Sequence, residues 1–184
     1  MAQFNVAVVV GSLAKDSINR KLAKALARLA PESLAFQFID LSSLPMYDRD
    51  LEAARPDAVN QFTAQLARAD AMLIVTPEHN RSIPAVLKNA IDWGSKPMDK
   101  NVWRNKPVAI TGTSPGAIGT AAAQQHLRQI MGILGSAVMG GEAYISFKPD
   151  MIDEQDAVHP EDTRNFLRAY MANFAAFTEK LVGR

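Results

Sequence analysis

The chain has 184 residues, with 20 Lys plus Arg against 19 Asp plus Glu, a formal net charge of +1 and 48% hydrophobic residues. This balance is typical of a globular protein and argues against disorder, a strongly basic nucleic-acid binder or an acidic tail. There is no cysteine, which excludes disulfides, zinc or iron–sulfur sites held by the chain's own thiolates, and a cysteine nucleophile. The three histidines, His79, His126 and His159, lie far apart in the sequence, so we expect no metal site.

The start of the chain, Met1–Asn5, has no basic region and leads directly into a strand pattern, so we expect no signal peptide. No apolar run approaches the roughly 20 residues that a membrane helix needs. Because domains usually contain roughly 100–200 residues, we expect residues 1–184 to form a single domain. These features indicate a cytoplasmic protein with no membrane or nucleic-acid partner.

Short aliphatic runs that predict strands alternate with longer amphipathic segments. The first run, Phe4–Val10, is almost continuously apolar, which is typical of a strand buried on both faces of a parallel sheet. The other predicted strands are Leu34–Ile39, Ala71–Thr76, Pro107–Thr111 and Ser136–Gly140.

Between these runs, hydrophobic side chains recur every three or four residues and predict helices. The repeating sets are Ile18, Leu22, Leu26 and Leu29; Val59, Phe62, Leu66 and Ala69; and Leu127, Ile130, Met131 and Leu134. A helix over Ala85–Trp93 and a terminal helix are also predicted, the latter docking through Phe166, Tyr170, Phe174, Phe177 and Leu181. The segment Glu142–Pro160 is weakly patterned and is predicted to be mostly loop. Five such alternations, with no repeat or linker, indicate a doubly wound three-layer α/β fold.

In a sheet of this kind, ligands bind beyond the carboxyl ends of the strands, and the loop Gly11–Arg20 follows the first strand. It has neither the GxGxxG pattern of dinucleotide-binding proteins nor the GK[ST] ending of a P-loop. It offers donors from Ser12, Ser17 and Asn19 and a cation, Lys15, at a helix N-terminus, which suits a phosphate monoester. The alternative is that Ser17 or Asn19 only caps the helix and Lys15 is a solvated charge.

The loop Thr76–Pro84 follows the third strand and is stiffened by two prolines. A rigid polar segment at this position can present backbone groups to a planar heterocycle with little ordering cost, and His79 could stack on such a ring. The alternative is a stiff turn in which Ser82 and Pro84 start the next helix and His79 is a surface histidine.

The loop Thr111–Thr120 follows the fourth strand and contains three glycines, which permit close backbone approach, together with Ser and Thr donors. The alternative is a glycine-rich turn into the helix that begins near Gly119. Each loop alone is weak evidence, but three polar, restricted loops at one end of a sheet together indicate a ligand site.

These segments resemble the NADPH-dependent FMN reductase family, in particular its chromate and quinone reductase branch. The resemblance covers most of the chain. The matching motifs are GSLAKDSINRKLA at Gly11–Ala23, TPEHNRSIPAVLKNAIDWGSKP at Thr76–Pro97, TGTSPGAIGT at Thr111–Thr120 and AQQHLRQIM at Ala123–Met131.

The resemblance implies a flavodoxin-like three-layer sandwich, with a five-stranded parallel sheet in the order 2-1-3-4-5 and non-covalently bound FMN. The residues that hold the FMN phosphate would be Ser12, Lys15, Ser17 and Asn19. Those that line the isoalloxazine ring would be Pro77, Glu78, His79, Asn80 and Arg81. Those that flank the ribityl chain or ring from the opposite loop would be Thr113, Ser114 and Gly116.

Two residues depart from the usual pattern of this family. Lys15 stands where Arg is more frequent, so a bidentate phosphate contact becomes a point charge. His79 stands where Tyr is usual, which places a smaller, titratable ring beside the flavin.

The resemblance implies an FMN-dependent NAD(P)H oxidoreductase that passes hydride from NADPH or NADH through FMN to quinones, chromate or similar acceptors. No catalytic side chain is expected, because the cofactor performs the redox step. Arg81, at the edge of the site, is a candidate contact for a cofactor phosphate or an anionic acceptor, or else a solvated loop cation. A homodimer or homotetramer is also implied, and helix Ala85–Trp93 with Trp93 and Trp103 could supply its interface, although a core role for Trp93 is favoured.

Two other kinds of function remain open at this point. An electron-carrier flavoprotein of the flavodoxin type would take electrons from a partner protein, but such carriers tend to be acidic, whereas the pI here is about 8.0. A flavin-free interaction module is disfavoured by the intact polar residues in all three loops.

Overall fold

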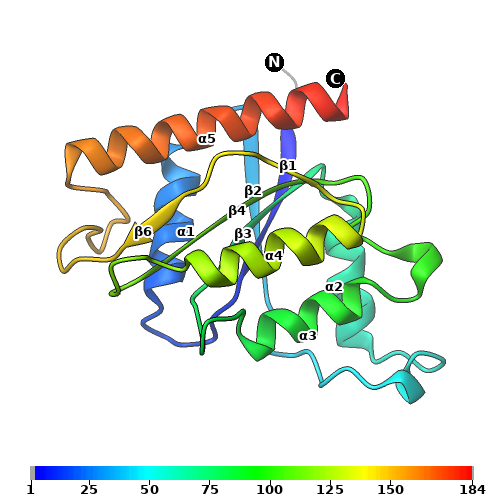
Figure 1. Cartoon of the computed structure of the whole chain (residues 1–184). Helices are drawn as coiled ribbons and strands as arrows, with labels where there is room; N and C mark the ends of the chain where they lie inside the picture. Colours follow the sequence, from blue (N-terminus) through cyan, green and yellow to red (C-terminus); the bar gives the residue numbers. More distant parts are fainter. Residues whose placement is uncertain (1–2, 184) are drawn as a thin grey trace.

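The computed structural model describes residues 3–183, so the first residues of the segment from which no signal peptide is expected lie outside it. Its six-stranded sheet has the order β2-β1-β3-β4-β5, with β6 paired to β4 (Figure 1). All the paired strands run parallel. The order predicted for the first five strands is therefore confirmed. The strands are β1 Phe4–Val10, β2 Leu34–Ile39, β3 Ala71–Val75, β4 Pro107–Ser114, β5 Ala137–Val138 and β6 Tyr144–Ser146.

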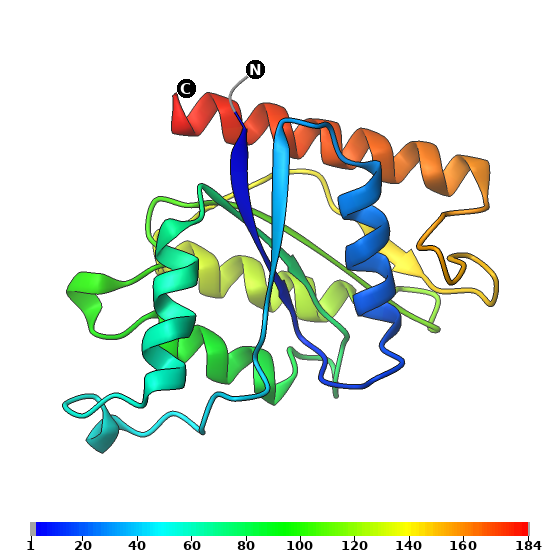
Figure 2. The same cartoon turned by 180° about the vertical axis from the view of Figure 1, so that it is seen from behind.

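The sheet is covered by helices on both faces, as Figures 1 and 2 show. The helices are α1 Ile18–Leu29, α2 Asp57–Arg68, α3 Ala85–Gly94, α4 Ala121–Ile133 and α5 Glu161–Val182. Side chains of α1 and α5 share one apolar cluster with alternate residues of β1 and β3. Those of α2, α3 and α4 share a second cluster with the intervening residues. This arrangement is the predicted three-layer α/β sandwich.

The period-2 geometry of strands explains why the central strands are continuously apolar. Every residue of β3 is fully buried, and in β1 only Asn5 is exposed. Successive side chains point to opposite faces, so a strand that is covered on both faces needs apolar residues at every position. Polar side chains can then gather only where the strands end.

The segment Glu142–Pro160 is mostly loop, as predicted, but it contains one strand that the sequence pattern did not predict. This strand, β6, aligns Tyr144, Ile145 and Ser146 with Gly112, Thr113 and Ser114. It extends the sheet beside the carboxyl end of β4, which is itself longer than the predicted Pro107–Thr111. A strand of three residues is too short to show an alternating hydrophobic pattern, so the sequence could not predict it. Its pairing depends on contacts with β4, which is distant in the sequence.

The terminal helix docks through a stripe that only partly matches the predicted one, since Phe177 also packs against the core. Tyr170 and Phe174 are buried, but Phe166 and Leu181 are 47% and 48% exposed. The buried positions of α5 are Leu167, Tyr170, Met171, Phe174, Ala175 and Thr178. The predicted stripe contains mostly aromatic residues, whereas the buried face of α5 also includes the non-aromatic residues Leu167, Met171 and Ala175.

Both tryptophans are core residues and not interface residues. Trp93 and Trp103 are fully buried. The indole N–H of Trp93 donates to the carbonyl of Pro45 at 2.8 Å, and that of Trp103 donates to the carbonyl of Ile91 at 3.1 Å. The favoured core role of Trp93 is therefore confirmed. Between residues 3 and 183, no helix is both long and apolar enough to cross a membrane.

Tyr170 provides a test of how α5 is attached to the sheet. Its hydroxyl donates to the carbonyl of Ile110 at 2.8 Å, and burial raises the pKa of Tyr170 far above its ordinary value of 10.0. The variant Tyr170→Phe should lose about 1 kcal/mol of unfolding free energy at neutral pH, because a buried hydrogen bond disappears.

Above pH 10 the unfolded chain can ionise this phenol while the folded protein cannot. The unfolding free energy of the wild type should therefore fall more steeply with rising pH than that of the Phe variant. Urea denaturation between pH 7 and pH 11 measures both effects. Parallel pH profiles for the two proteins would contradict this account.

Candidate functional site

Three loops meet at the carboxyl ends of β1, β3 and β4, at the lower left of Figure 1. They comprise residues 11–17, 76–84 and 115–120. These loops lie within the segments Gly11–Arg20, Thr76–Pro84 and Thr111–Thr120, in which the sequence predicts a ligand site. β1 lies between β2 and β3 in the sheet, so the chain leaves β1 at the point where the strand order reverses. Ligands of doubly wound sheets bind at this point.

The first loop presents a helix N-terminus together with an unpaired cation. Ser17 caps α1, with its hydroxyl accepting from the N–H of Arg20 at 3.2 Å, so the capping interpretation is confirmed. The backbone N–H groups of Ile18 and Asn19 have no acceptor within residues 3–183. Lys15 is exposed and has no hydrogen-bond or ion-pair partner in the same part of the chain. Free N–H groups, a helix dipole and a lysine together suit an anion.

Asn19 joins the first loop to the third. Its side-chain N–H donates to the carbonyl of Thr113 at 2.9 Å, and its side-chain oxygen accepts from the N–H of Thr113 at 2.9 Å. Asn19 is 2% exposed and Thr113 is fully buried, so both bonds are shielded from water. The amide of Asn19 is therefore engaged within the protein, and its effect on the loop is to fix the start of α1 against the end of β4.

The second loop contains a tight turn with unusual backbone geometry. His79 and Ser82 exchange two backbone hydrogen bonds at 2.9 Å. The two residues between them, Asn80 and Arg81, have φ values of 51° and 63°. Positive φ at both central positions is typical of a type I′ turn, and for residues other than glycine it costs on the order of 1 kcal/mol each. His79, Asn80 and Arg81 are all exposed at its tip.

Glu78 ties the second loop to the start of α4. One carboxylate oxygen accepts from the N–H groups of Ala122 at 2.9 Å and Ala123 at 3.3 Å, and the other accepts from Arg81 at 3.0 Å. The Glu78 side chain is only 8% exposed, whereas that of Arg81 is 73% exposed. A carboxylate at a helix N-terminus satisfies orphan N–H groups and complements the dipole. A hydrogen bond of 3.0 Å between Ser82 and His126 joins the same two elements.

The third loop is closed by its own side chains and approaches the second loop closely. The hydroxyl of Ser114 donates to the carbonyl of Gly119 at 2.6 Å and accepts from the N–H of Gly116 at 3.2 Å. A Cβ atom at Gly112 would lie 1.9 Å from the carbonyl oxygen of Thr76, so only glycine fits there.

Large apolar side chains are exposed on two of these loops. Leu13 on the first loop and Ile118 on the third are each 51% exposed. An apolar flank beside anion-binding donors is what a molecule with a flat ring and a phosphate requires. The donor set and the apolar flank therefore fit FMN.

The twelve residues suggested by the sequence thus divide into two groups. Some lie at the surface of the loops, where a ligand can reach them: Ser12, Lys15, Pro77, His79, Asn80, Arg81 and Gly116. In the others the side-chain polar groups are engaged inside the protein: Ser17, Asn19, Glu78, Thr113 and Ser114. Sequence reasoning missed the cap that Glu78 provides, because its partner Ala122 lies 44 positions away. It also missed Leu13 and Ile118.

The fold and this site define a flavodoxin-like α/β protein. A flavodoxin, WrbA-like protein from Agrobacterium tumefaciens superposes with a TM-score of 0.61, at 20% identity over 97% of this chain and 99% of that one, which shows the fold. Residues 4–150 match the family model described as NADPH-dependent FMN reductase. The chain belongs to this family and is an oxidoreductase that uses FMN and NAD(P)H.

Two further relatives match almost the whole chain. A 2-hydroxy-1,4-benzoquinone reductase from a Burkholderia species is 49% identical over 173 residues, which cover 94% of each chain. The structure of FerB, a flavoenzyme NAD(P)H:(acceptor) oxidoreductase from Paracoccus denitrificans, superposes with a TM-score of 0.93 at 42% identity, covering 96% of this chain and 98% of that one.

The tether between Asn19 and Thr113 leads to a prediction. The variant Asn19→Ala should lose about 2–4 kcal/mol of unfolding free energy, because it leaves two buried backbone groups of Thr113 without a partner. Asn165→Ala, on the exposed face of α5, is the matched control and should change stability by less than about 0.5 kcal/mol. Urea denaturation measures both, and equal midpoints for the two variants would contradict the tether.

Proposed function

We propose that this chain is an FMN-dependent NAD(P)H oxidoreductase that reduces quinones, and also chromate or similar acceptors. The proposal is carried mainly by the N-terminus of α1, where unpartnered N–H groups and Lys15 lie beside two loops that are tethered in place. It is supported by the relative named 2-hydroxy-1,4-benzoquinone reductase, which is 49% identical. The chain's near-neutral charge also disfavours an electron carrier that docks on a partner protein.

In this proposal the first loop holds the FMN phosphate, and its residues have two different roles. Lys15, Ser12 and the free N–H groups at the start of α1 contact the phosphate oxygens. Ser17 and Asn19 belong to the same site but act mainly by shaping it, since their side chains bond to Arg20 and Thr113. Lys15 acts as a point charge, so we expect the neighbouring backbone N–H groups to set the geometry.

The other two loops line the isoalloxazine ring and the ribityl chain. Pro77, His79, Asn80 and Arg81 present their backbone or side chains to the ring, while Glu78 holds that loop against α4. Gly116 flanks the opposite side, and Thr113 and Ser114 fix the end of β4 and the third loop behind it through their hydrogen bonds to Ile145 and Gly119. Leu13 and Ile118 exclude water. Bound FMN would supply the hydride and electron transfer between NAD(P)H and the acceptor, so the proposal requires no nucleophile or metal from the chain itself.

We further propose one domain over residues 1–184, a cytoplasmic location, and assembly into a homodimer or homotetramer. The apolar surface beside the second loop supports assembly. A cavity of about 500 Å³ between α3 and α4 is lined partly by Ile83, Ala85 and Ile130, and Ile133 on α4 is 85% exposed. Burying such surface is favourable, so a second copy of the chain suits this face.

The first experiment is an absorption spectrum of the purified protein, before and after anaerobic addition of NADPH or NADH. We expect a flavin spectrum that bleaches with the nicotinamide and recovers when a quinone is added. The variant Lys15→Met should weaken FMN binding by about tenfold, because it removes a charge-assisted phosphate contact. Lys180→Met, on the exposed face of α5, is the control and should bind FMN like the wild type.

Two results would contradict this proposal. If no flavin is present and added FMN does not bind, the assignments in all three loops are wrong. If bound flavin is indifferent to both NADPH and NADH, an electron carrier that is reduced by a partner protein is the better description.

Arg81 is the proposed contact for a cofactor phosphate or an anionic acceptor. The guanidinium end of its pair with Glu78 is 73% exposed, so the pair is screened by water and Arg81 can turn to a ligand. Arg81→Ala should raise KM for NADPH and for chromate by about fivefold while kcat stays nearly constant. Alanine keeps the same strained φ, and Arg168→Ala removes a charge elsewhere as a control. Unchanged KM values would exclude this role.

A further inference from the structure

A large cavity lies away from the three loops. It has a volume of about 720 Å³ and runs between α2 and the segment that joins α3 to β4, residues 95–106. In Figures 1 and 2 this segment projects from the opposite side of the molecule to the loops after β1, β3 and β4. Small-molecule sites usually occupy roughly 300–1,000 Å³, so the cavity has the size of a ligand site.

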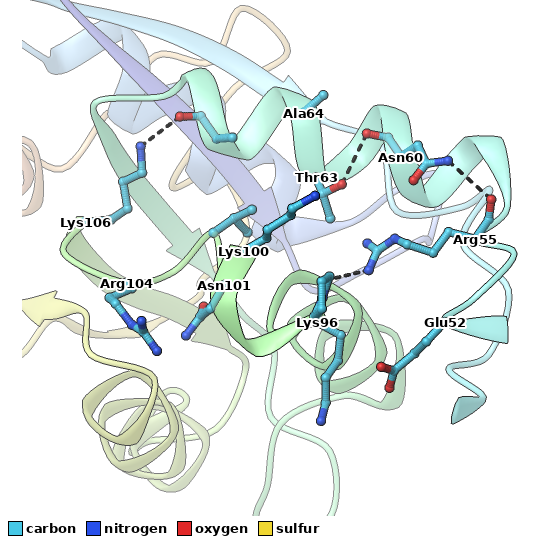
Figure 3. A pocket seen from close by; sticks show the side chains of 13 residues that line it. Glu52, Arg55, Asn60, Thr63, Ala64, Lys96, Lys100, Asn101, Arg104 and Lys106 are labelled. Carbon is cyan, nitrogen blue, oxygen red and sulfur yellow. Dashed lines mark hydrogen bonds between the residues drawn. The ribbon is translucent and has the colours of Figure 1, made fainter. Parts of the chain in front are cut away.

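The side chains that line the cavity give it a strong positive charge. Five of them are cationic: Arg55, Lys96, Lys100, Arg104 and Lys106. Only one lining residue, Glu52, is acidic, and its carboxylate accepts a hydrogen bond from the hydroxyl of Tyr47. Figure 3 shows Arg55 and Lys100 pointing into the cavity from its two walls. The whole chain has a net charge of only +1, so this excess is local.

Two of the five cations have structural roles that fix the walls. Lys106 is half-buried and donates hydrogen bonds to the carbonyls of Ala67, at 3.0 Å, and Ala69 at the end of α2. Burial lowers the pKa of Lys106, and the negative charge of Asp70 partly opposes this shift. The guanidinium of Arg55 donates to the carbonyl of Lys96 and lies 5.6 Å from the centre of the Trp93 ring.

The other three cations are available to a ligand. Lys96 and Lys100 form no ion pair within residues 3–183, and Arg104 makes only one long hydrogen bond, 3.5 Å to the carbonyl of Met98. Asp99 lies on the same short helix as Lys100, Met98–Lys100, but does not line the cavity. Cations that line one cavity and have no carboxylate partner repel one another, and a bound anion relieves this repulsion.

We propose that this cavity is a second binding site, for an anionic ligand that carries a diphosphate group. Two or more phosphate charges match the three available cations. The walls also include apolar surface from Ala64, Ala67, Pro97 and Val102, which accommodates an organic group attached to the diphosphate. The ligand class is therefore a nucleoside diphosphate or a free diphosphate. The site is separate from the proposed FMN site and does not depend on it.

The test is a calorimetric titration of the FMN-loaded protein with inorganic pyrophosphate and with ADP. The double variant Lys96→Met/Lys100→Met removes two available cations, and Arg168→Met/Lys180→Met removes two exposed cations from α5 as the matched control. We expect one site per chain, with Kd for both probes raised about tenfold or more by the first pair and less than about twofold by the second.

Thermal unfolding distinguishes a ligand site from a purely structural role of these lysines. Without a ligand, the Lys96→Met/Lys100→Met variant should have a Tm equal to or above that of the wild type, because repulsion is relieved. Pyrophosphate should raise the Tm of the wild type but not of this variant. NADPH-dependent turnover of a quinone should be the same in both proteins.

Three results would overturn the proposal. The first is no binding of either probe at millimolar concentration. The second is an equal loss of binding in the α5 control, which would show unspecific attraction. The third is binding that is lost in Lys15→Met and kept in Lys96→Met/Lys100→Met, which would place the probe at the first loop.

Tighter binding of ADP than of pyrophosphate identifies a nucleotide as the ligand, and equal binding identifies a free diphosphate. If the protein fails to bind FMN, the same comparison is made on the flavin-free chain.

Discussion

Burial of the sheet on both faces is the constraint on which the rest of this molecule depends. β1 and β3 lie between two layers of helices, so polar side chains are excluded from their inner positions and gather where the strands end. Near the end of β4 the hydroxyls of Thr111 and Thr113 are tolerated because they donate to the carbonyls of Ala143 and Ile145 at 2.8 Å. The loops beyond the strands therefore contain both the candidate site residues and the hydrogen bonds that hold these loops in place.

The strands and helices could be predicted from the sequence, because apolar runs and three-to-four-residue periods report local burial. The sheet order was implied by the family resemblance, and the place of the candidate site followed from the doubly wound fold. The tethers within the site could not be predicted in this way. In the sequence, nothing distinguishes Glu78 from other carboxylates in loops. Its role as a cap appears only in the folded structure, where it accepts a hydrogen bond from Ala122, 44 positions later. The sequence also failed to predict β6 and the buried face of α5, for the same reason. The pairing of the three β6 residues and the partial exposure of Phe166 depend on contacts with residues that are distant in the sequence.

The turn at the tip of the second loop shows what these tethers accomplish. Asn80 and Arg81 adopt a backbone conformation that neither residue favours by itself. Two sets of contacts offset the free-energy cost of this strained conformation in the folded protein. They are the paired backbone hydrogen bonds of His79 and Ser82 and the hydrogen bonds of Glu78 to the start of α4. A planar ligand then meets a surface that is already ordered, and little of its binding energy is spent on immobilising the loop.

The near-zero net charge of the chain conceals two separate positive regions. One is the cationic lining of the cavity between α2 and residues 95–106. The other is limited to Lys15 and the free N–H groups of α1, because acidic side chains, among them Asp16 and Asp153, line the same depression as Lys15. Layers of apolar side chains lie between them, and salt at physiological strength screens exposed charges beyond about 8 Å. We therefore expect an anion that binds in one region to leave the affinity of the other unchanged.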